Sequence, residues 1–231
     1  MREVKEVLFF DSTFLLLIPA LFLAIYAHAR VTQTYALLSQ KQARVGLSGR
    51  EVAENLIRSL GIGVRLEEIP GALTDHYDPG RETMRLSQAV AQGRSIADLA
   101  IVAHEVGHIL QKRGGYSPFK LRGALVPVAG FGSQLALPLF FLGFLFAFRP
   151  LMDLGILFFS VAVLFQLVTL PVEFDASHRA YEVLERSSLV AEEEKPLVRK
   201  MLQAAALTYV AATAMAALQL VRLLLLRQSR D

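Results

Sequence analysis

The sequence contains no cysteine, which excludes disulfide bonds, thiolate metal ligands and cysteine nucleophiles. Any metal ion must therefore be held by histidine, aspartate or glutamate. Charged residues are also scarce, at 19% of the 231 residues, and the net charge of +3 is not concentrated in a dense basic tract. Nucleic-acid-binding proteins gather Lys and Arg on one face, so nucleic acid is not an expected partner.

Hydrophobic residues are abundant instead, at 54% of the chain. A helix needs about 20 apolar residues to cross a hydrocarbon layer of about 30 Å. The sequence predicts four such transmembrane helices, with the lipid bilayer as a partner, at residues 7–29, 123–148, 153–172 and 201–226. The first is expected to be a retained anchor, because its apolar region is longer than that of a secretory signal.

Cationic residues near the ends of the spans predict the orientation, because Lys and Arg are retained on the cytoplasmic side. Four spans put residues 30–122 and 173–200 on one side of the membrane. That side carries Arg30, Lys41, Arg44, Lys112, Arg113, Lys120, Arg122, Arg179, Lys195, Arg199 and Lys200. The other side carries fewer, namely Arg2, Lys5, Arg149, Arg227 and Arg230. The larger loop is therefore expected in the cytoplasm.

Residues 30–122 are polar enough to form a folded extramembrane region with helices and a small sheet. Ser48 and Glu51 have the spacing of a capping box, which predicts a helix that ends before Gly61. Short alternating runs separated by Pro-Gly and Asp-Pro-Gly predict strands, one of them at residues 83–86. A second helix is predicted at residues 95–113, with Ser95 as its N-cap. It is too short to span a membrane.

That second helix contains the motif HEVGH at residues 104–108. Residues four apart lie on one face of a helix, so His104 and His108 can bind the same ion. Glu105 lies about 100° around the helix, where it can accept a proton from a water that the ion activates. This is the H-E-x-x-H arrangement of zinc peptidases, and burying two histidines and a glutamate without a cation would be unfavourable.

A catalytic zinc site uses three protein ligands. Two clusters on the correct side of the membrane supply candidates, at residues 74–80 and 171–185. We favour Glu173, which follows the third span directly, in a predicted helix and loop at residues 173–200. Asp175 would face another way on a continuing helix, where it could orient a ligating imidazole or simply be a charge near the start of a helix.

The residues "AHEVGHILQ", "LFQLVTLPVEFDASHRA" and "TYVAATAMAALQLVRLLLL" resemble the YugP-type neutral zinc metallopeptidases of bacterial membranes. This resemblance implies a zincin-like α+β catalytic region in a mostly α, multi-pass protein of the bacterial inner membrane. It also implies Zn2+ bound by His104, His108 and Glu173, with Glu105 as the base. A more distant similarity to HtpX and the CAAX prenyl proteases supports Glu173, but those families have aspartate at the position of Ser177. Asp175 or His178 could replace that aspartate.

Several alternatives stay open from the sequence. The oxyanion of the reaction could be stabilised by His178, Arg179, Tyr181 or His76, and the strand at residues 83–86 could pair with an extended peptide. The substrate would be a peptide or a membrane protein. Close-packing small residues in the spans would allow a partner protein or a homo-oligomer. The rival functions are a catalytically silent zinc-dependent scaffold or sensor, and an intramembrane protease that uses Asp153.

Overall fold

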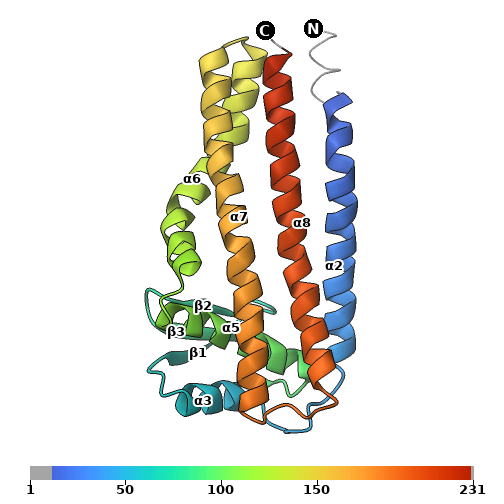
Figure 1. The fold of residues 1–231 in the computed structure, drawn as a ribbon, viewed down its shortest axis with the longest axis vertical. Coiled ribbons are helices and arrows are strands. Elements are labelled where there is room, and N and C mark those ends of the chain that lie inside the picture. The colour runs from blue at the N-terminus through green and yellow to red at the C-terminus, as the bar shows by residue number, and fades with distance from the viewer. Residues whose placement is uncertain (1–11, 230–231) are drawn as a thin grey trace. The chain divides into compact units, whose positions relative to one another are not determined.

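The computed structural model describes residues 12–229 and is dominated by long helices (Figure 1). The helix η1 (Ser12–Leu17) continues directly into α2 (Ile18–Leu38). The others are α6 (Ser117–Leu145), α7 (Arg149–Arg186) and α8 (Lys195–Gln228). Each of these four segments is long and apolar enough to cross a membrane, within the described residues. The expected mostly α membrane protein is therefore confirmed. The start of the first predicted span, residues 7–11, lies outside the described residues, as do Arg2, Lys5 and Arg230.

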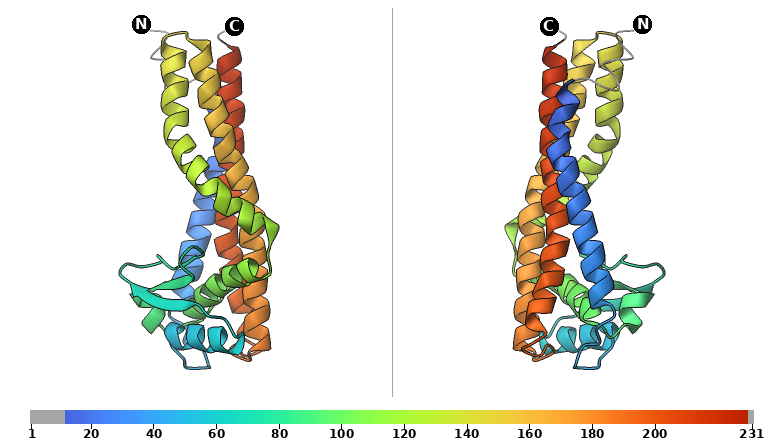
Figure 2. Two further views of the ribbon diagram at one scale, coloured as in Figure 1. Left: turned by 90° about the vertical axis from the view of Figure 1, so that its left-hand side faces the viewer. Right: turned by 90° about the vertical axis from the view of Figure 1, so that its right-hand side faces the viewer.

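The chain divides into two compact units. The first comprises Met1–Ala27, Lys120–Leu170 and Thr208–Asp231. Within it the helices run side by side (Figures 1 and 2), and α6, α7 and α8 share a buried cluster around Phe140 and Met152. Close approach in the α6–α7 hairpin requires Gly155, because a Cβ atom there would lie 2.6 Å from the backbone nitrogen of Phe140.

The second unit comprises His28–Phe119 and Pro171–Leu207. It contains α3 (Gly49–Ser59), α4 (Gln88–Gln92) and α5 (Ile96–Arg113), together with segments of α2, α7 and α8. The predicted capping box of Ser48 with Glu51 is present at α3, and the predicted N-cap Ser95 forms a second one with Asp98 at α5. These reciprocal hydrogen bonds satisfy backbone N–H groups that a helix start leaves without partners.

A three-stranded sheet completes the second unit, formed by β1 (Arg65–Ile69), β2 (His76–Asp78) and β3 (Thr83–Ser87). The order is β1-β3-β2, with β1 parallel and β2 antiparallel to β3. The strand expected at residues 83–86 is therefore the central one. Its backbone is paired on both sides and cannot bind a peptide, whereas β2 is an edge strand of the sheet.

The core of the second unit is built around α5. This helix is buried along most of its length, and its apolar side chains pack with those of α3, β3, α7 and α8. The largest fully buried members include Leu56, Met84, Leu99, Ile109 and Leu184. Complete burial of one such side chain stabilises a fold by roughly 1.5–3 kcal/mol. The motif helix is thus held on several sides by packed side chains.

Candidate metal centre

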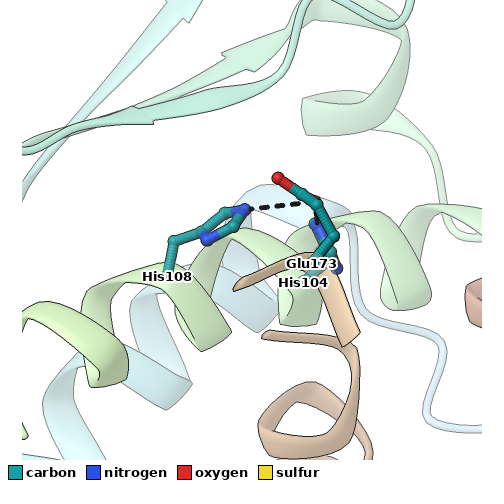
Figure 3. A group of neighbouring side chains, drawn as sticks. All are labelled: His104, His108 and Glu173. Carbon is teal, nitrogen blue, oxygen red and sulfur yellow. Dashed lines mark hydrogen bonds and ion pairs between the residues drawn. The ribbon is translucent and has the colours of Figure 1, made fainter. Parts of the chain in front are cut away.

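The structure brings His104, His108 and Glu173 together, with one ligand atom from each lying within 4.8 Å of the others. The Nε2 atom of His104 is 3.1 Å from Oε2 of Glu173, and that of His108 is 3.7 Å from the same oxygen. Figure 3 shows the two imidazoles rising from one helix and the carboxylate reaching them from another. Glu173 is almost fully buried, with 2% of its side chain exposed, whereas the side chains of His108 and His104 keep 10% and 17% exposed.

This arrangement fits a zinc ion in both chemistry and spacing. Two imidazole nitrogens and one carboxylate oxygen form a ligand set of catalytic zinc sites. With zinc-to-ligand distances of about 2.0–2.2 Å, tetrahedral ligand atoms stand about 3.3–3.6 Å apart. The separations of 3.1 and 3.7 Å between the imidazole nitrogens and the carboxylate oxygen lie on either side of that range. All three ligand atoms lie within 4.8 Å of one another, so rotation of the side chains, chiefly of the two imidazoles, would bring them to the tetrahedral spacing.

Close packing of two helices creates this convergence. Gly107 of α5 lies directly against the backbone of α7, where a Cβ atom would be 2.3 Å from the carbonyl oxygen of Ala176. Any side chain at residue 107 would force the helices apart. Helix α7 also continues through Pro171 to Arg186 without a break, so Glu173 lies within a long helix and not at the start of a new one. Its position is fixed by that helix.

The imidazole of His108 is held from behind by Gln111, whose Oε1 atom lies 3.0 Å from Nδ1. Gln111 is completely buried and lies one helical turn after His108. Burial lowers the pKa of His108, and the nearby His104 lowers it further. The imidazole is therefore held neutral near pH 7, which is the form that binds a metal ion.

The imidazole of His104 has a different neighbour, because its Nδ1 atom lies 3.3 Å from the hydroxyl of Ser177. Ser177 thus itself contacts His104, at the position where the distant families have aspartate. The proposed substitutes behave differently. His178 is exposed and pairs with Glu182 at 3.3 Å. Asp175 reaches the centre only through Gln111, which donates to it at 2.8 Å.

Asp175 is held by a second partner, since the Arg179 guanidinium donates to it at 2.6 Å. Burial alone would raise the pKa of Asp175, but the hydrogen bonds from Arg179 and Gln111 outweigh that effect and lower it. The carboxylate therefore stays ionised at neutral pH. Gln111 was not among the residues expected from the sequence, although its position three residues after His108 places it on the same side of the helix.

Glu105 is also part of this buried region, with 7% of its surface exposed. Its negative charge is close enough to His108 to favour the protonated imidazole, although burial outweighs this influence. Glu105 follows His104 directly in α5 and is not one of the three converging residues. Its role as the base stays a prediction of the motif.

The remaining candidates lie elsewhere. Arg179 pairs with Asp175, and Tyr181 packs under the guanidinium of Arg199 at 4.5 Å. His76 belongs to β2, where its Nδ1 atom lies 2.8 Å from the carbonyl oxygen of Thr74. Asp153 belongs to the other unit and forms an ion pair with Arg227 at 2.8 Å. These contacts provide no support for Asp153 as a metal ligand.

The turn between β2 and β3 is fastened to the end of α5. The Lys112 ammonium donates both to the carbonyl oxygen of Pro79 and to the carboxylate of Glu82. The hydroxyl of the buried Tyr77 donates to the same carboxylate at 2.6 Å. The hydrogen bonds from Lys112 and Tyr77 lower the pKa of Glu82, which keeps this carboxylate ionised. The edge strand β2 is thus fixed against the motif helix.

Fold and site together define a class of protein. An H-E-x-x-H helix with a distant glutamate, in a chain with four candidate spans, is the arrangement of a membrane-bound zinc peptidase. The comparisons with known proteins agree.

Residues 13–228 match the family described as "Putative neutral zinc metallopeptidase". The chain is also 42% identical over 212 residues to "Putative membrane protease YugP" of Bacillus subtilis (strain 168), covering 91% of this chain and 94% of that protein. The chain therefore belongs to this zinc metallopeptidase family, which implies Zn2+ as its metal. No solved structure gives a significant match.

Proposed function

We propose that this protein is a zinc-dependent endopeptidase of the gluzincin type, in which His104, His108 and Glu173 hold the ion. The observation that carries the proposal is the convergence of these three side chains beside a buried glutamate. A zinc ion held by these residues would lower the pKa of a bound water toward about 7 and would polarise the carbonyl of the scissile bond. Glu105 accepts the proton of the attacking water and then delivers it to the leaving amine.

The edge strand β2 supports a mode of substrate binding. Its outer edge carries no partner strand in the described sheet, and the link from Lys112 to Glu82 holds its turn against α5. An extended peptide can pair with such an edge through backbone hydrogen bonds. We therefore place the substrate backbone along residues 76–78, beside the metal centre, instead of along β3.

Removal of the metal tests the proposed activity. The purified protein in detergent should cleave an unfolded test protein such as casein. Incubation with a chelator should abolish cleavage, and stoichiometric zinc should restore it. Fragment patterns would separate an endopeptidase, which produces internal fragments, from an enzyme that trims ends. A zinc-loaded protein that cuts neither casein nor membrane-protein substrates would favour the scaffold or sensor function.

We also propose that the apolar segments of the first unit span the bacterial inner membrane, with the second unit on its cytoplasmic face. The chain changes unit at residues 27–28, 119–120, 170–171 and 207–208, close to the predicted ends of the four spans. The excess of cationic residues around the second unit supports this orientation.

The absence of cysteine makes this topology directly testable. In intact cells, a membrane-impermeant thiol reagent should label Phe148→Cys, in the exposed hairpin of the first unit, and should leave Gln40→Cys unlabelled until the membrane is opened. The unmodified protein has no cysteine and should not be labelled, so it serves as the negative control. The reverse labelling pattern would place the metal centre outside the cytoplasm.

A further inference from the structure

The side-chain amide of Gln111 has only one favourable orientation. Its nitrogen donates to the carbonyl oxygen of Val172 at 2.7 Å and to Oδ2 of Asp175 at 2.8 Å. Both partners are acceptors, and the two hydrogens of the amide are thereby used. Rotation by 180° would place the amide oxygen against two other oxygens in a fully buried site. The amide oxygen must therefore face His108.

This orientation determines which nitrogen of His108 carries the proton. The Oε1 atom of Gln111 can only accept a hydrogen bond, so Nδ1 of His108, 3.0 Å away, must donate. The neutral ring then has its lone pair on Nε2. That atom is the one that faces Glu173. The hydroxyl of Ser177, in contrast, can donate or accept, and so does not select a tautomer of His104.

The partner of Gln111 is itself held in place. Asp175 receives hydrogen bonds from Nε of Arg179 at 2.6 Å and from a second guanidinium nitrogen at 3.4 Å. Arg179 also lies over the ring of Tyr116, 5.7 Å from its centroid. Arg179 in addition lines a groove of about 640 Å³ between α3 and α7, so the chain of contacts runs from the buried imidazole to the surface.

We propose that Gln111, Asp175 and Arg179 are positioning residues that select the Nδ1-protonated tautomer of His108 and fix its ring for metal binding. Arg179 thus has a role different from that of an oxyanion donor. The inference rests on the proposed zinc site. Mutation of a residue that hydrogen-bonds to a metal ligand typically lowers metal affinity by about 10–100-fold. The effect should be smaller for residues that lie further from the ion.

The first test is zinc affinity, measured on the metal-free protein in detergent by competition with a chromophoric chelator. Gln111→Met keeps the approximate side-chain volume and should weaken binding by about 10–100-fold. Asp175→Asn should weaken it by about tenfold, because the amide carries no charge to hold the Arg179 guanidinium, and its NH2 group would replace Oδ1, which accepts from the second guanidinium nitrogen. Arg179→Gln should have a smaller effect. The double variant Asp175→Asn/Arg179→Gln should be no weaker than Asp175→Asn alone, because the two residues act in series.

Matched controls come from the same helix. Glu182→Gln matches Asp175→Asn, and Arg186→Gln matches Arg179→Gln. Each control lies about two turns further along α7 than the residue it matches, among side chains that pair with each other and with His178. Both should bind zinc like the unmodified protein. Thermal unfolding of each metal-free variant would identify a loss of affinity caused by unfolding. If Gln111→Met does not fold, Asp175→Asn and the double variant carry the test.

A second readout is independent of zinc. In ¹⁵N-histidine NMR spectra of the metal-free protein, which has five histidines, the signal lost in His108→Asn should report protonation at Nδ1. Gln111→Met should shift this signal toward a mixture of tautomers. An Nε2-protonated His108 in the unmodified protein, or zinc affinities unchanged in folded Gln111→Met and Asp175→Asn, would overturn the proposal. Failure of the unmodified protein to bind zinc would instead refute the metal site itself.

Discussion

Replacing Glu105 by glutamine should lower kcat/KM for peptide cleavage by about 10²–10⁴-fold and leave the zinc content unchanged. Glutamine has nearly the same shape as glutamate but cannot accept a proton at neutral pH. Glu105 is not one of the three converging side chains, so the metal should remain bound. The measurements are initial rates on a peptide substrate and metal analysis of the same preparation.

Glu54→Gln is a suitable control for this experiment. Glu54 lies on α3 in the same unit and pairs with Arg50 at the surface, so its replacement changes the charge equally without reaching the centre. Its activity should equal that of the unmodified protein. A scaffold or sensor would retain its cellular function in Glu105→Gln. Full peptidase activity in that variant would show that another group acts as the base.

Glu173→Ala and His104→Ala should each lose zinc. Structural zinc sites with four ligands bind with roughly 10–16 kcal/mol, which corresponds to about 3 kcal/mol for each ligand. Loss of one ligand should therefore reduce the affinity by about 100-fold or more. Metal analysis after dialysis against a weak chelator would measure this effect, and peptidase activity should fall in parallel.

The comparison between these two variants is informative because their residues lie on different helices. Glu182→Ala provides the control on α7, since Glu182 contacts His178 and Arg186 but no member of the centre. If Glu173→Ala retained full zinc while His104→Ala lost it, the ion would be held without the third ligand. The assignment of Glu173, and with it the proposed mechanism, would then be wrong.

The local features of the site could be predicted because they depend on neighbouring residues in the chain. Four-residue spacing places His104 and His108 on one helical face, and Ser95 with Asp98 starts that helix. The third ligand required more, because no local pattern shows that α5 and α7 cross at Gly107 and Ala176. Glu173 could be favoured from its place in the chain, but its distance from the imidazoles could not.

Contacts that depend on this crossing were correspondingly difficult to predict. Asp175 had two possible roles, to orient an imidazole or to be a charge near the start of a helix, and the structure instead places Gln111 between Asp175 and His108. Ser177 contacts His104, although the sequence favoured other residues for that role. The order of the strands was also unpredictable, because the alternation within residues 83–87 does not reveal that β3 pairs on both edges.

The separation of 69 residues between His104 and Glu173 has a consequence for biosynthesis. Under the proposed mechanism, a nascent chain that ends before residue 173 has His104, His108 and Glu105 but lacks the third ligand, so it should bind the ion weakly. The glutamate arrives only after the second and third apolar segments have been translated and inserted. The proposed site would therefore protect an incomplete chain, still attached to the ribosome, against hydrolysing itself or its neighbours.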